Sequence, residues 1–128
     1  MNIKTLVIDD DEISVMLTDL MIRDSPLASE IITFSDGVYA IEYLKNKYNV
    51  DTQYVIILDI NMPLMNGWEF LERIKSFVST KNTYVFMLSS SSDEADIKKS
   101  SKFRLVEGYF MKPLQKEHLK QIAAIVKS

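Results

Sequence analysis

Five short runs of apolar residues divide the chain at regular intervals. They lie at residues 3–8, 31–34, 55–58, 84–88 and 108–111. The run at 55–58, Val-Ile-Ile-Leu, is apolar at every position and rich in β-branched residues. This pattern is typical of a strand buried on both faces of a parallel sheet, because such a strand has no solvent side on which polar residues would alternate. We therefore predict five strands, of which 55–58 is the central one.

Between these runs, apolar residues recur at the spacing of helices with one buried face. Residues 13, 16, 17, 20 and 21 are all Ile, Met or Leu and predict a helix that buries this face. The later helices are marked by Val38, Ile41 and Leu44, by Phe70, Leu71, Ile74, Phe77 and Val78, and by Leu119, Ile122, Ala123 and Val126. The segment 93–103 has helical composition but few apolar residues, so we expect it to be loosely held. Strands that alternate with helices predict an α/β fold, in which helices cover both faces of a parallel sheet.

Polar side chains follow four of the five predicted strands. Asp59 ends the central strand, Asp9 and Asp10 end the first, Ser89 ends the fourth and Lys112 ends the fifth. The carboxyl ends of parallel strands meet at one edge of the sheet, where ligands bind in open α/β folds. Carboxylates gathered there repel one another unless a cation lies between them, and Mg²⁺ prefers such oxygen ligands. The pattern predicts a metal site, a carboxylate nucleophile, a hydroxyl and a fixed cation at one edge.

Other polar residues have simpler structural interpretations. We expect Asp11 and Asp36 to cap helices, Glu12 to lie in a first helical turn, Ser91 and Ser92 to cap the helix that follows them, and His118 to be exposed and without a role.

The composition narrows the classes of function. The 128 residues fit one domain, and we expect a single unit over 1–128 without an output module. Cysteine is absent, which excludes disulfides, thiolate metal sites and thiol catalysis. A net charge of −3 argues against non-specific nucleic-acid binding, and the sequence has neither a membrane-length apolar run nor a signal-peptide pattern. We therefore expect a cytoplasmic protein that binds neither nucleic acid nor membrane.

Four motifs, in order and at consistent spacing, resemble the receiver domain of two-component response regulators. They are VIDDDE at 7–12, LDINMPLMNGWEFL at 58–71, MLSS at 87–90 and GYFMKPL at 108–114. Over its whole length the chain looks like a single-domain, chemotaxis-type regulator. The resemblance implies a flavodoxin-like receiver fold with a five-stranded parallel sheet of order 2-1-3-4-5.

Carried over position by position, the resemblance also assigns the site. It makes Asp59 the phosphoacceptor and assigns Mg²⁺ to Asp9, Asp10 and Asp59, with a backbone carbonyl from Asn61. Ser89 takes the conserved Ser/Thr place and Lys112 the invariant lysine place.

The remaining features implied by the family concern switching and partners. Tyr109 takes the aromatic switch place, Pro113 would follow a cis peptide bond, and Ser90 stands where a small residue is usual. A histidine kinase or histidine phosphotransfer protein would donate the phosphoryl group, and a downstream protein target would bind the face formed by 93–103, the strand of Tyr109 and the last helix. Such a protein supports only its own phosphorylation and dephosphorylation, and we expect a monomer or weak dimer.

Three other classes remain as alternatives. A haloacid-dehalogenase-type phosphohydrolase would use Asp9 as nucleophile and Asp11 as acid/base, but the chain lacks a late acidic pair for the metal and room for a cap domain. A flavodoxin-like cofactor binder needs a phosphate cradle rich in Gly, Ser or Thr, whereas the first loop here is acidic. A purely structural adaptor would not need Asp59.

Overall fold

The computed structural model describes residues 2–126, so the ends of the expected 1–128 domain lie outside the described residues. Strands and helices alternate through this part of the chain. They are β1 (Asn2–Ile8), α1 (Glu12–Arg23), β2 (Ile31–Phe34), α2 (Gly37–Lys47), β3 (Thr52–Leu58), α3 (Gly67–Ile74), β4 (Thr83–Ser89), α4 (Glu94–Ser100), β5 (Val106–Met111) and α5 (Lys116–Ile125). All sheet pairings are parallel and the strand order is β2-β1-β3-β4-β5, as predicted.

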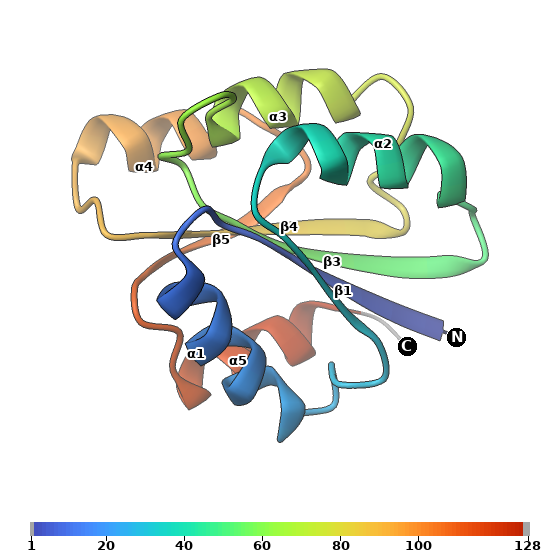
Figure 1. Cartoon of the computed structure of the whole chain (residues 1–128), viewed down its shortest axis with the longest axis horizontal. Helices are drawn as coiled ribbons and strands as arrows, with labels where there is room; N and C mark the ends of the chain where they lie inside the picture. The colour runs from blue at the N-terminus through green and yellow to red at the C-terminus, as the bar shows by residue number, and fades with distance from the viewer. Residues whose placement is uncertain (1, 127–128) are drawn as a thin grey trace.

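The sheet forms the middle layer of three (Figure 1). Helices α2, α3 and α4 cover one face, and α1 and α5 cover the other. Every residue of β3 and β4 is buried, which explains why both strands read as continuous apolar runs instead of alternating ones.

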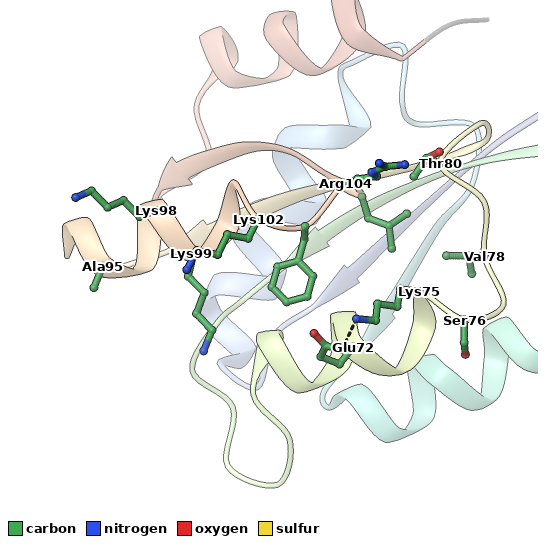
Figure 2. A pocket seen from close by; sticks show the side chains of 12 residues that line it. Glu72, Lys75, Ser76, Val78, Thr80, Ala95, Lys98, Lys99, Lys102 and Arg104 are labelled. Carbon is green, nitrogen blue, oxygen red and sulfur yellow. Dashed lines mark ion pairs between the residues drawn. The ribbon is translucent and has the colours of Figure 1, made fainter.

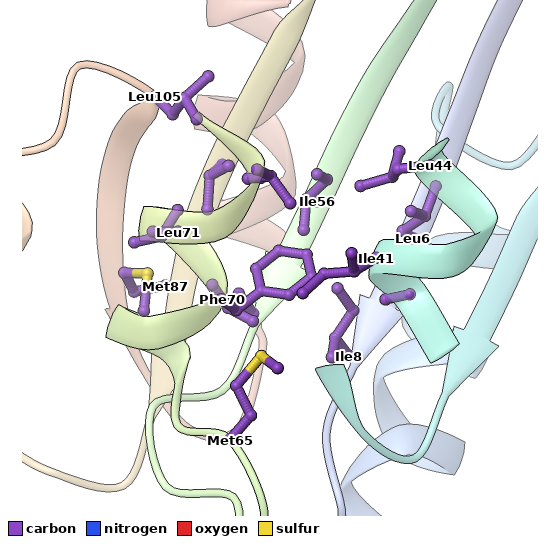
Figure 3. Close-up of a cluster of buried hydrophobic side chains, with 14 of the residues drawn as sticks. Leu6, Ile8, Ile41, Leu44, Ile56, Met65, Phe70, Leu71, Met87 and Leu105 are labelled. Atoms are coloured by element: carbon purple, nitrogen blue, oxygen red, sulfur yellow. The ribbon is translucent and has the colours of Figure 1, made fainter. Parts of the chain in front are cut away.

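Successive residues of the central strands serve two separate cores. Leu6, Ile8 and Ile56 point into the core beneath α2 and α3, whereas Val7 and Ile57 belong to the core beneath α1 and α5. Figure 3 shows the first core, in which Phe70 from α3 and Ile41 from α2 meet above the strands. These two cores fix the strands in register, and thereby fix the edge of the sheet at which the strands end.

The prediction for α1 was wrong about the buried face. Ile13, Met16, Leu17 and Leu20 are 64%, 56%, 52% and 57% exposed, respectively. The helix instead buries Thr18 and Ile22, and Val15 and Met21 pack partly against the core. The expected face and the observed one lie side by side on the helix, and apolar spacing alone does not distinguish a core face from an uncovered one.

Helices α2 and α4 show smaller departures. Ile41 and Leu44 are buried as predicted, but Val38 is 47% exposed. Helix α4 ends at Ser100, earlier than the expected 103, and Ser100 is the only buried residue of this helix. The prediction that this helix is loosely packed is confirmed.

Candidate functional site

Asp59 lies at the point where β3 leaves the core. Its backbone N–H donates to the carbonyl of Ile8 at 3.0 Å, which ties it to the end of β1. The loop after it turns back so that the Gly67 N–H donates to the carbonyl of Ile60 at 2.8 Å. A Cβ atom on Gly67 would lie 2.7 Å from the carbonyl oxygen of Asp59, so a glycine is needed at this close approach.

Three carboxylates gather at this edge. Asp9, Asp10 and Asp59 each offer an oxygen, and these oxygens lie within 4.8 Å of one another. Asp9 and Asp59 are buried and Asp10 is exposed. The N–H of Asp11 donates to Asp9 Oδ1 at 3.0 Å and thereby orients the Asp9 carboxylate.

Lys112 brings a positive charge to the same place from the end of β5. Its Nζ lies 2.8 Å from Asp9 Oδ2 and 3.7 Å from Asp59 Oδ2. Its backbone N–H donates to the carbonyl of Ser89, and its peptide bond to Pro113 is cis, as predicted. The ammonium therefore bridges the two buried carboxylates that would otherwise repel each other.

The pKa values of the site reflect this balance. Burial, together with the charge of Asp9, raises the pKa of Asp59 from 3.8 to about 6, although Lys112 and the backbone N–H of Asn61 act in the opposite direction. For Lys112, burial works to lower the pKa, but the hydrogen bond to Asp9 and the charges of Asp59 and Asp9 outweigh it and raise the pKa. An ionised Asp59 thus carries a free-energy cost that added positive charge would relieve.

Ser89 is completely buried beside this cluster of charges and is linked to α4 through Ser91. The N–H of Ser91 donates to Ser89 Oγ at 3.1 Å, and the Ser91 hydroxyl donates to Asp96 Oδ2 at 2.9 Å. The Tyr109 hydroxyl donates to the Ser91 carbonyl at 2.7 Å. Ser91 therefore joins Ser89, α4 and Tyr109 through its own backbone and side chain.

This network corrects one prediction. Asp93, and not Ser91 or Ser92, is the N-cap of α4, because its side chain accepts from the N–H of Ala95. Ser91 is one of four consecutive serines at 89–92, and nothing in their spacing indicates that this one bonds to its surroundings on three sides. The caps at Asp11 and Asp36 are confirmed, since each side chain accepts from the first turn of its helix.

His118 is also placed differently from the prediction. It is half-buried, its ring stacks on Phe110 with ring centroids 4.4 Å apart, and its Nδ1 accepts from the N–H of Gln115. It therefore stabilises the start of α5.

The structure brings together the residues that the sequence singled out. Asp9, Asp10, Asp59 and Lys112 form one cluster, and Asn61 is exposed in the loop after Asp59. The carbonyl of Ser89 accepts from the backbone N–H of Lys112, and both Ser89 and Tyr109 bond to Ser91. The sequence analysis missed the uncovered apolar face of α1. Ile13 and Leu17 on this face border a groove of about 240 Å³ that Lys112 also lines.

The carboxylates fit a hard divalent cation. Their oxygens lie close together, two of the three side chains are buried, and burial together with the charge of Asp9 raises the pKa of Asp59. Oxygen donors of this type suit Mg²⁺, which binds through a few carboxylates and keeps several waters.

Comparison with known proteins identifies the family. The family description "response regulator receiver domain" matches residues 5–124. The chain belongs to this family. As receivers are signalling domains and not classical enzymes, the match supports a role in phosphorelay signalling.

Individual relatives agree with this assignment. The chain is 31% identical to the chemotaxis protein CheY of Halobacterium salinarum, over 88% of this chain and 87% of that protein. The crystal structure of a two-component response regulator from Cytophaga hutchinsonii aligns with a TM-score of 0.87 at 32% identity, covering 96% and 95% of the two chains. The transcriptional regulatory protein CitT of Halalkalibacterium halodurans is 27% identical over 92% of this chain, which spans only 49% of that protein. Within residues 2–126, no helix is both long and apolar enough to span a membrane.

Proposed function

We propose that this receiver is a cytoplasmic phosphorelay response regulator that accepts a phosphoryl group on Asp59. The buried Asp59 carboxylate, flanked by two further carboxylates and the Lys112 ammonium, is the observation that carries the proposal. A histidine kinase or a histidine phosphotransfer protein is the proposed donor.

The chemistry follows from the residues at the edge. An Asp59 oxygen attacks phosphorus and forms an acyl phosphate, while the phosphorus–nitrogen bond of phosphohistidine breaks and its electron pair returns to the imidazole. The Lys112 ammonium neutralises a phosphoryl oxygen, and the Ser89 hydroxyl donates to another. Mg²⁺ bound by Asp9, Asp10, Asp59 and the Asn61 carbonyl would supply further positive charge to the phosphoryl oxygens.

The exposed face of α1 supports docking of a protein donor. Four neighbouring exposed side chains of α1, Ile13, Met16, Leu17 and Leu20, form one continuous apolar patch. Continuous apolar patches on a protein surface mark interaction sites, whereas single exposed apolar residues do not. Lys112 lines the groove beside this face, and its Nζ lies 3.7 Å from Asp59 Oδ2. A donor helix packed on Ile13, Met16, Leu17 and Leu20 would bring a phosphohistidine to the edge where Asp59 lies.

The proposed output runs from Ser89 to α4, β5 and α5. When the Ser89 hydroxyl turns toward a phosphoryl group, its contact with the Ser91 N–H changes, and Ser91 also holds Tyr109. Helix α4 buries no apolar side chain, so its position costs little to change. A downstream protein that prefers the altered position would bind more tightly after phosphorylation. We propose protein partners, no nucleic-acid or membrane binding, and a monomer or weak dimer.

The phosphohydrolase alternative finds less support. Its acid/base, Asp11, is committed as the N-cap of α1, where its Oδ1 accepts from the N–H groups of Ile13 and Ser14. The receiver match over residues 5–124 also favours the phosphoacceptor role.

Intact-mass measurement after incubation with a small phosphodonor and Mg²⁺ tests the proposal. We expect the wild type to gain one phosphoryl group, the Asp59→Asn variant to gain none, and Asp51→Asn, which changes an exposed carboxylate elsewhere, to behave as the wild type. Phosphorylation of the Asp59→Asn variant, or turnover of a small phosphate ester that depends on Asp9 alone, would refute the assignment.

A further inference from the structure

A second charged site lies between α3 and α4, apart from the edge of the sheet that carries Asp9, Asp10, Asp59 and Lys112, which we call the acceptor edge. An open groove of about 970 Å³ is lined by five basic residues, Lys75, Lys98, Lys99, Lys102 and Arg104, and by none of the residues at the acceptor edge. Figure 2 shows Lys75 projecting from α3 on one side and Lys99 and Lys102 on the other. Glu72 is the one acidic residue in the lining, and it pairs with Lys75 at 2.6 Å. We refer to this feature as the basic groove.

The basic groove also has apolar walls. Val78 and Phe103 are half-buried against the core, and Leu105 is 5% exposed. The Phe103 ring stacks on Trp68 at 5.9 Å, and the Lys99 Nζ lies 5.3 Å from the centre of the Trp68 ring. Cations on the rim and apolar side chains inside give the groove two kinds of contact at once.

Local helix electrostatics explain only part of this charge. Lys98 and Lys99 lie in the last turn of α4 and Lys75 caps the end of α3, positions that favour positive charge. Lys102 directly follows the C-cap of α4, but Arg104 lies further along the segment leading to β5, away from any helix end. The chain as a whole has a net charge of −3, so a groove with five basic residues and one acidic residue differs in sign from the rest of the protein.

We propose that the basic groove binds an acidic protein segment that also carries apolar side chains. Carboxylates of such a segment complement the five basic residues, and its apolar side chains fit against Val78 and Phe103. A nucleic acid is disfavoured, because Phe103 is the only aromatic residue of the lining and its ring is already stacked on Trp68. This site goes beyond the proposed phosphoryl transfer and does not depend on it.

NMR titration with a synthetic peptide in which glutamate pairs alternate with single leucines tests the inference. We expect amide shifts centred on residues 75–80 and 98–105 and a change in Trp68 fluorescence, because two lining residues contact that ring. Replacing two of the five cations, by Lys102→Glu with Arg104→Glu, should weaken binding about tenfold, since each reversal removes an attraction and adds a repulsion. The matched variant, Lys45→Glu with Lys47→Glu at exposed positions of α2 outside the groove, changes the net charge equally and should bind as the wild type.

Three results would overturn the proposal. These are shifts that map outside the groove, equal loss of binding in both double variants, and tighter binding of a single-stranded oligothymidylate than of the peptide at this site. A peptide that contains glutamate but no leucine should bind more weakly, and equal binding would contradict the role of the apolar walls. Because the Asp59→Asn variant retains every lining residue, it should bind the peptide normally even if phosphoryl transfer fails.

Discussion

Replacing Asp59 by Asn should make the metal-free protein more stable. The side chain is only 7% exposed and lies beside Asp9, and its pKa is raised from 3.8 to about 6 by burial and by that neighbouring charge. A raised pKa means that the folded protein disfavours the ionised carboxylate. The Asn amide has a similar shape and no charge, so the substitution removes this cost.

The magnitude follows from the pKa shift. A change of about two units corresponds to roughly 3 kcal/mol, at about 1.36 kcal/mol per unit. This value is an upper limit, because structural relaxation around Asp59 and bound counterions lower the cost of the ionised carboxylate. We therefore expect a gain of about 1–3 kcal/mol in the free energy of unfolding near neutral pH. For a chain of this size each kcal/mol should raise Tm by about 3–5 °C.

The pH dependence gives the sign of the effect. Between pH 3.8 and about 6 the folded state holds the Asp59 proton more tightly than the unfolded state does. The contribution of this group to stability therefore falls as the pH rises through that window, and it stays low above it. The Asn variant should lack this loss, so the stability of the two proteins should diverge across the window and remain separated at higher pH.

Urea unfolding in EDTA across this pH range is the direct assay. Asp10→Asn is the matched control, because Asp10 belongs to the same cluster but is exposed, and its effect should be much smaller. Addition of Mg²⁺ should stabilise the wild type more than the Asp59→Asn variant, since in the proposed site the ion would bind the carboxylates of the folded state only. An Asp59→Asn protein no more stable than the wild type without metal, or an equal gain from Asp10→Asn, would refute the reasoning.

Three further predictions concern docking, backbone approach and coupling. Leu17→Asp should slow phosphoryl transfer from a histidine phosphotransfer protein about tenfold, yet leave transfer from a small phosphodonor unchanged. Tyr39→Asp, which replaces an exposed side chain on α2, should change neither rate. Gly67→Ala should lower the free energy of unfolding by about 1–3 kcal/mol, because the new Cβ meets a backbone oxygen, and Gly37→Ala, which meets side chains at 3.2 Å, should cost less in the same denaturation assay. Tyr109→Phe should lower the protection of the amides at 91–96 from hydrogen exchange, with a loss of about 0.5–1.5 kcal/mol for the hydroxyl bond; unchanged protection would show that this bond does not hold the loop.

The strands and their polar ends were predictable from sequence because both follow from burial. A strand buried on two faces needs apolar residues throughout, so Asp59 and Ser89 stand out where β3 and β4 leave the core. The four motifs added the order of the sheet, which the apolar pattern alone does not determine.

The errors arose where a residue's environment depends on packing between distant elements. Leu17 and Thr18 are neighbours in sequence, yet Thr18 faces the sheet and Leu17 faces solvent, a choice set by how α1 lies on the sheet. Ser91 is linked to β5 because that strand brings the Tyr109 hydroxyl to the Ser91 carbonyl, which lies far away in sequence. His118 is partly covered because the Phe110 ring lies against it.

The contacts of Ser91 have a thermodynamic consequence. If its position couples the acceptor edge to a partner on α4, then the coupling must act in both directions, because a free-energy cycle closes whichever ligand binds first. A partner that favours the phosphorylated arrangement must tighten the binding of a phosphoryl mimic at Asp59 by the same factor. The amount of target protein in the cell would then help to determine how readily the receiver is phosphorylated, so the target would influence the signal as well as receive it.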